Sequence, residues 1–225
     1  MSIPVGNVLK GDKYLAALIR VIRHLPNHPR HHGVQMQAHH IISEKGVSLS
    51  GRGKKLVQIG YDINDLPNLV FIPCTLQGAC HLGVQVHRGN HTAPVDQNKS
   101  DRDGDKSLNY HDMVRTQILD LALPLAKSCT NTSAANAVTE VNKVGKRILR
   151  WIQDSPGKAP LTAAAKAFQP GSPVGCGGVD AVGSLKGSVT PCPKERNHFR
   201  RQGRGQSPEN ITYQSDKPYR LAPGR

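Results

Sequence analysis

Histidine is the residue type in this sequence whose number and spacing could support chemistry. Ten of the 11 histidines lie between residues 24 and 111, and four of them form the adjacent pairs His31-His32 and His39-His40. A neutral imidazole ligates divalent metal ions, and imidazole also exchanges a proton near neutral pH. The histidines of this segment are therefore candidates for a metal site, for a general base, or for both.

The two pairs differ in their surroundings. His31-His32 lies in a connector rich in proline, histidine and arginine, whereas His39-His40 lies within a strand-like stretch, residues 34–43. Neighbouring side chains of a strand point to opposite faces of a sheet. In the second pair, one imidazole can thus bind a metal ion while the other performs a different task. Five other histidines are interpreted as packing or surface residues: His24, His28, His31, His32 and His198.

Composition and hydrophobic periodicity indicate the elements that must position these histidines. Residues 34–43 and 69–73 have the composition of strands, and we expect them to frame the segment between them. Apolar residues recur at helical spacing in three further stretches. Helices are therefore predicted at residues 13–25, 110–127 and 134–154.

A family resemblance rests on segments that extend from the second histidine pair to a later helix. They are Ala38-His39-His40, Gly60-Tyr61-Asp62-Ile63-Asn64, Asn68 with the strand after it, His87-Arg88-Gly89-Asn90-His91, and Tyr110. In these residues the sequence resembles the AHH family of the HNH/endonuclease VII (ββα-metal) nucleases, over residues 34–127. The resemblance implies an α+β fold in which a β-hairpin and the helix after it grip one divalent cation. It also implies cleavage of nucleic acid, often by toxin domains of bacterial conflict systems.

The resemblance also implies roles for individual residues. His39, His87 and His91 are the implied metal ligands, and three protein ligands leave coordination positions open for water and phosphate. His40 is the implied general base for the attacking water, with its ring oriented through loop contacts held by Asn68. The cation would stabilise charge on the phosphate and the leaving oxygen, and the products would carry a 5′-phosphate and a 3′-hydroxyl. Zinc, magnesium, manganese and nickel stay open as the metal.

One departure from the family pattern leaves the ligand set open. A polar insertion at residues 94–109 delays Tyr110, whereas an aromatic residue usually follows the last histidine of the family within a few positions. The ligands could therefore be shifted locally. His81 and His111 are the alternatives to the implied ligands.

The charge of the chain fits a polyanionic partner. Its 30 Lys+Arg residues outnumber 16 Asp+Glu residues, which gives a formal charge of +14. Each phosphate neutralised by a basic side chain releases condensed counterions, so binding of nucleic acid is favoured without regard to its sequence. Arg88, Lys54 and Lys55 are the candidate nucleic-acid contacts, and Arg88 could clamp a neighbouring phosphate.

Other compositional features exclude several classes of protein. The chain has 225 residues with 9 aromatic ones, so its core must be modest. No apolar run approaches the roughly 20 residues that cross a bilayer, and the first residues lack a signal-peptide pattern. We therefore expect a soluble protein without membrane insertion. The five scattered cysteines favour reduced thiols over a disulfide framework.

We divide the chain into four parts. Residues 1–33 are an N-terminal helix and basic connector, 34–127 the nuclease core, 128–155 a packing helix, and 156–225 a basic tail rich in proline and glycine. We expect the tail to be largely irregular and partly disordered, with one short helix at residues 161–168. Little of it is expected to pack in a core.

The first functional hypothesis is a metal-dependent endonuclease, a non-specific DNase with RNA as an alternative substrate. The basic tail and the lack of a sequence-reading module favour an antibacterial effector, delivered by a specialised secretion system into the cytoplasm of a target cell. A cognate immunity protein with an acidic surface would then restrain it. Two alternatives stay open: a zinc-stabilised nucleic-acid-binding module without catalysis, and an HNH endonuclease of phage or restriction biology.

Overall fold

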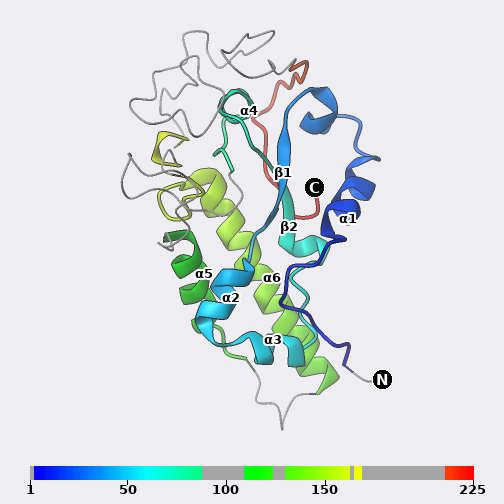
Figure 1. Ribbon diagram of the computed structural model, residues 1–225, viewed down its shortest axis with the longest axis vertical. Coiled ribbons are helices and arrows are strands. Elements are labelled where there is room, and N and C mark those ends of the chain that lie inside the picture. The colour runs from blue at the N-terminus through cyan, green and yellow to red at the C-terminus, as the bar shows by residue number, and fades with distance from the viewer. Residues whose placement is uncertain (1–2, 88–108, 124–129, 163–164, 169–210) are drawn as a thin grey trace.

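The computed structural model describes residues 3–87, 109–123, 130–162, 165–168 and 211–225 (Figure 1). Within these residues, helices surround one two-stranded antiparallel sheet, so the fold is α+β as predicted. The helices are α1 (Tyr14–Ile22), α2 (Glu44–Ser50), α3 (Gly53–Gln58), α4 (Leu76–Leu82), α5 (Asn109–Leu119) and α6 (Asn131–Asp154). The strands are β1 (Met36–His40) and β2 (Leu69–Pro73), and short 3-10 turns occur at Pro29–His32, Leu66–Asn68 and Ala165–Phe168.

The sheet confirms the two predicted strands, although β1 is shorter than the predicted residues 34–43. β1 pairs with β2 so that His39 lies opposite Val70 and His40 lies opposite Leu69. Residues that face each other across a ladder share a face of the sheet, and consecutive residues alternate between faces. His39 and His40 therefore point to opposite faces, as the sequence predicted.

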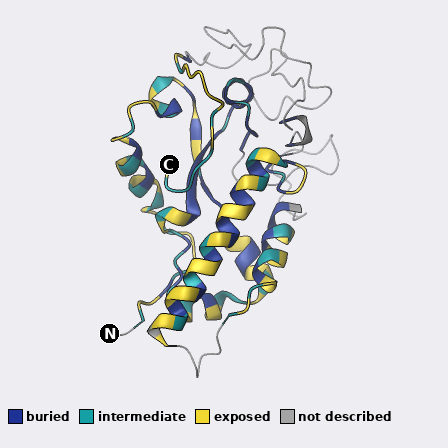
Figure 2. Ribbon diagram, turned by 180° about the vertical axis from the view of Figure 1, so that it is seen from behind, coloured by how far each residue is buried: buried dark blue, intermediate teal, exposed yellow. Residues whose placement is uncertain are grey.

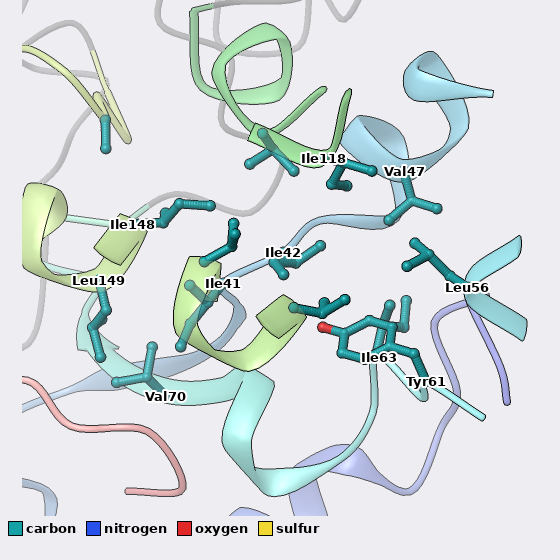
Figure 3. Close-up of a cluster of buried hydrophobic side chains, with 14 of the residues drawn as sticks. Ile41, Ile42, Val47, Leu56, Tyr61, Ile63, Val70, Ile118, Ile148 and Leu149 are labelled. Atoms are coloured by element: carbon teal, nitrogen blue, oxygen red, sulfur yellow. The ribbon is translucent and has the colours of Figure 1, made fainter. Parts of the chain in front are cut away.

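Each face of the sheet packs against its own hydrophobic core. Val70 belongs to the core that α5 and α6 contribute to, whereas Leu69 belongs to the core that includes residues of α1. Ile41 and Ile42, which follow β1 directly, extend into the first core (Figure 3). The chain just beyond the histidine pair is thus fixed by buried side chains.

The sequence of α6 determines how this helix begins and which side it buries. Thr130 and Ser133 form a reciprocal capping box at its start. Its apolar residues recur every three or four positions and face the core, while the opposite side is exposed (Figure 2). The predicted helix at 134–154 is therefore confirmed. No helix in the described ranges is both long and apolar enough to cross a membrane.

The other two predicted helices are present but shorter than expected. The helix predicted at 13–25 is α1, Tyr14–Ile22, followed by Pro26. The helix predicted at 110–127 is α5, which ends at Leu119, and residues 124–129 lie outside the described part of the chain.

The helices α2, α3 and α4 have no counterpart among the predicted helices. Ser43 caps α2 by accepting a hydrogen bond from Gly46 N, and Thr75 caps α4 in the same way. Gly46 also brings α2 close to α5, since a Cβ atom at this position would lie 2.4 Å from Val114 Cγ1. These short helices depend on local caps and on contacts with the rest of the fold more than on periodicity.

The expectation that little of the tail packs in a core is wrong for residues 211–225. Ile211 is buried in the core beside α1. Further along, Gly224 N donates to Leu69 O at 2.7 Å, and Phe71 N donates to Arg225 O at 3.0 Å. The end of the described chain therefore lies along the edge of β2 that β1 does not occupy (Figure 1). The predicted limits of the four parts remain predictions.

Candidate active site

His39 points from β1 toward α5, where Tyr110 fixes its orientation. His39 Nε2 lies 2.9 Å from the Tyr110 hydroxyl oxygen, and this hydroxyl donates its own hydrogen to the carbonyl of Ile41. The hydrogen of the first contact must therefore come from His39 Nε2. In the neutral ring the lone pair is then on Nδ1, which gives this side chain a defined metal-binding tautomer.

His87 lies against His39 although the two are 48 residues apart in the sequence. Its backbone N donates to Pro73 O at 2.8 Å, which holds it beside the end of β2. The His87 Nδ1–H donates to Gln37 Oε1 at 3.0 Å, and the ring centroids of His39 and His87 are 4.9 Å apart. Burial, assisted by the positive charge of Lys10, lowers the pKa of His87 to about 3. His87 is therefore neutral at physiological pH, with its lone pair on Nε2.

His40 lies on the other face of the sheet, toward α1. His40 Nε2–H donates to Asn64 Oδ1 at 3.2 Å, and the ring packs edge-on against Tyr14 with centroids 4.5 Å apart. The lone pair of the neutral ring is therefore on Nδ1. This nitrogen is the one that can accept a proton.

Several groups set the protonation of His40. Burial lowers its pKa below the usual value, and the charge of Lys10 acts in the same direction. The hydrogen bond to Asn64 and the carboxylates of Glu44 and Asp62 oppose this shift without cancelling it. His40 is thus neutral near pH 7, as a general base must be.

Asn64 positions His40, a role that was not predicted from the sequence. Asn64 Nδ2 donates to Leu9 O and to Asp62 Oδ1, both at 2.9 Å, while its Oδ1 also accepts from Gly11 N at 2.9 Å. The amide is therefore locked with its oxygen toward His40. Asn64 closes the Gly60-Tyr61-Asp62-Ile63-Asn64 stretch, which was the available signal in the sequence.

Asn68 holds backbone contacts on both sides of the histidine pair's loop, and its predicted role in orienting His40 stays a prediction. Its Oδ1 accepts from Ile42 N at 2.7 Å, and its Nδ2 donates to Ile42 O and to Ile63 O. Asn68 thus ties the chain after β1 to the chain before β2, and its side chain bonds backbone groups rather than the His40 ring. It supports the strand end that carries the histidine pair.

Residues 23–148 match the sequence model of one family. This family is described as a nuclease family of the HNH/ENDO VII superfamily with conserved AHH. This chain belongs to the AHH family. The Ala38-His39-His40 signature lies at the end of β1, where the geometry above places it. No curated protein and no solved structure shows significant similarity to the chain.

Membership of the AHH family makes the protein an endonuclease, an enzyme that hydrolyses phosphodiester bonds of nucleic acid. The two-stranded sheet with its helices is consistent with a ββα-metal core. Nucleases of this superfamily generally use a divalent metal ion.

The donor chemistry of His39 and His87 fits a metal of this AHH nuclease. Both rings are buried, and each donates one ring N–H to an oxygen, which is the usual outer-shell arrangement of metal-binding histidines. No group of three or more His, Cys, Asp or Glu side chains among the described residues is placed to hold a metal. His91, the third ligand implied by the resemblance, and Arg88 lie outside the described residues.

The two alternative ligands point elsewhere. His81 Nε2 lies 2.9 Å from the carbonyl oxygen of Tyr213, in the last described segment. His111 Nδ1 lies 2.9 Å from the hydroxyl of Ser43, where α5 packs on α2. These contacts join elements of the fold, and the choice between the two ligand sets stays a prediction.

Lys54 and Lys55, the other candidate nucleic-acid contacts, lie exposed on α3. The hydrogen bonds and ring contacts given for His39, His40 and His87 within the described residues do not involve either lysine. Their role as nucleic-acid contacts stays a prediction.

Proposed function

We propose that this AHH nuclease is a DNase in which a divalent metal is held by His39, His87 and His91 and in which His40 is the general base. The observation that carries the proposal is the geometry at the end of β1. His39 and His40 face opposite sides of the sheet. His39 contacts the neutral imidazole of His87, and His40 is fixed by Asn64.

The residues of the chain perform the steps as follows. His40 Nδ1 takes a proton from water as the water oxygen bonds to phosphorus, and the bond to the leaving oxygen breaks. The leaving oxygen then takes a proton from solvent. When bound, the metal supplies Lewis acidity that stabilises the negative charge on the phosphate and on the leaving oxygen. Tyr110 and Gln37 keep the two ligand rings in their metal-binding tautomers.

Cleavage of supercoiled plasmid tests this proposal. The purified protein is titrated with Mg²⁺, Mn²⁺, Zn²⁺ and Ni²⁺, with EDTA as one control and His40→Ala as the inactive variant. His24→Ala is the matched control, since His24 is exposed. We expect metal-dependent nicking that EDTA and His40→Ala abolish and His24→Ala retains.

A binding module without catalysis would behave differently. Wild type would then bind the plasmid and leave it intact with every metal, and His39→Ala would lower stability while His40→Ala had little effect. Cleavage of RNA but not of plasmid would instead change the substrate class of the enzyme.

We further propose an antibacterial role in which an acidic immunity protein restrains the nuclease in the producing cell. The charge of +14 supports an acidic inhibitor. Expression of wild type in a bacterial cytoplasm should stop growth, whereas His40→Ala should not. Rescue by the product of a small neighbouring gene would identify the immunity protein, and a neighbouring methylase or packaging gene would favour restriction or phage biology.

A further inference from the structure

The segment before α1 is fastened against the loop that positions His40. Ile63 N donates to Asn7 O at 2.8 Å, and Asn7 N donates to Tyr61 O at 2.9 Å. Gly6 packs so closely on this loop that a Cβ atom would lie 2.4 Å from Tyr61 O. This segment therefore has a fixed place beside the candidate active site.

Lys10 lies within this segment, and its backbone is held on both sides. Its N donates to Glu44 Oε2 at 3.0 Å. The residues before and after it, Leu9 and Gly11, both bond the amide of Asn64. The same amide orients His40, so the position of Lys10 is coupled to that of the general base.

The side chain of Lys10 is exposed and extends over Tyr14. Its Nζ lies 5.1 Å from the centroid of the Tyr14 ring, which packs against the His40 ring. None of the ion pairs found in the described part of the chain involves Lys10. The Lys10 ammonium therefore lies over the ring that packs against the proposed general base.

We propose that Lys10 binds a non-bridging oxygen of the phosphate that is cleaved. The ammonium is a strong donor to phosphate, and it would act where negative charge increases during water attack. In this role Lys10 binds a phosphate oxygen and transfers no proton. This inference rests on the proposed function, and it concerns a residue that precedes the family match at residues 23–148.

A substrate with a single phosphate tests the assignment. Bis(4-nitrophenyl) phosphate has no flanking phosphate, so a lysine that contacts only the rest of a nucleic acid would not affect its hydrolysis. Lys10→Met keeps the length of the side chain and removes the charge, and Lys10→Arg keeps the charge. Lys45→Met, at an exposed position on α2, is the control for loss of one positive charge.

We expect Lys10→Met to lower kcat/KM roughly 10- to 100-fold for both plasmid and bis(4-nitrophenyl) phosphate, as the loss of a hydrogen bond to a charged group would. Lys10→Arg should recover most of this loss, and Lys45→Met should leave hydrolysis of the small diester unchanged. Lys10→Met should also weaken inhibition of plasmid cleavage by inorganic phosphate to a similar extent. Thermal melting should match wild type, since the Lys10 side chain is exposed.

The proposal is overturned if Lys10→Met cleaves plasmid as wild type does, or if its loss on plasmid comes with unchanged inhibition by inorganic phosphate. The second result would assign Lys10 to a flanking phosphate. A wild type that cleaves nothing with any metal overturns the proposed function instead. Wild-type cleavage that depends on His40 but not on Lys10 overturns this inference alone.

Discussion

At the scale of single residues, the tautomer of His40 depends on Asn64. The amide oxygen accepts the Nε2 hydrogen of His40, and Asp62 and Leu9 hold the amide in that orientation. Asn64→Ala removes the acceptor, so the Nδ1–H tautomer, which has no lone pair for water at Nδ1, becomes populated. We expect kcat for plasmid cleavage to fall roughly 10- to 100-fold, as for other residues that orient a reacting histidine.

Two controls separate this orienting role from a general loss of structure. Asn136→Ala changes an exposed asparagine on α6 and should leave kcat unchanged. Nitrogen NMR of the His40 ring reports the tautomer directly. An Asn64→Ala protein with an unchanged His40 ring spectrum would contradict the orienting role, whatever its activity.

At the scale of elements, local sequence could predict those that form from their own periodicity. Residues 69–73 were predicted as a strand from their apolar run, and α6 from its repeating stripe. The helix α2 was not predicted because three of its seven residues are glycine or serine. Its stability comes from the Ser43 cap and from packing on α5. The packing of α2 on α5 joins segments far apart in the sequence, so no local sequence pattern predicts it.

The close approach of α2 and α5 gives a prediction at the same scale. Gly46→Ala would bring a methyl group within 2.4 Å of Val114 Cγ1, and Val114 is fully buried. We expect the free energy of unfolding to fall by about 1–3 kcal/mol, as for other overpacked sites, although alanine is a better helix former than glycine. Urea denaturation measures this change.

Gly145→Ala is the matched control for this prediction. The nearest atom to its added methyl group is Ile42 Cδ1 at 4.0 Å, so there is room for it within α6. Helix propensity alone should then stabilise the protein by about 0.5–1 kcal/mol. The Gly46→Ala, Val114→Ala double variant should be more stable than expected from the sum of the single changes. Equal gains from both glycine substitutions would show that α2 and α5 do not approach as described.

At the scale of the whole molecule, segments far apart in the sequence assemble the site. The opposite orientations of His39 and His40 could be predicted, because neighbouring residues of one strand point to opposite faces of the sheet. Lys10 and Asn64 could not be assigned, since their roles depend on hydrogen bonds that span 53 or more residues, between Gly11 and Asn64 and between Leu9 and Asn64. The packing of residues 211–225 along β2 escaped prediction for the same reason, as its apolar side chains are few and separated by polar ones.

The stability of the whole fold should depend on pH through His28. This ring is 4% exposed, and burial, with the charges of His31, Arg225 and Arg30, lowers its pKa to about 4. In the unfolded chain its pKa is about 6.5, so between pH 6.5 and 4 the unfolded state binds a proton that the folded state excludes. The free energy of unfolding should therefore be highest above pH 6.5 and fall by on the order of 3 kcal/mol by pH 4 through this residue alone.

His28→Asn isolates this contribution. Asparagine can still accept the hydrogen bond that His28 Nδ1 takes from Arg30 N, but it does not titrate. Urea denaturation is measured in EDTA, so that protons and metal do not compete for His39 and His87. The lowered pKa of His87 affects the stability of both proteins equally. The stability of the variant should therefore decrease less than that of wild type from pH 7.5 to 4.5, while His24→Ala, at an exposed position, should follow wild type. If stability depended on pH equally in His28→Asn and in wild type, His28 would be protonated in the folded protein. The buried Nε2 could bind that proton only if the ring moved toward solvent.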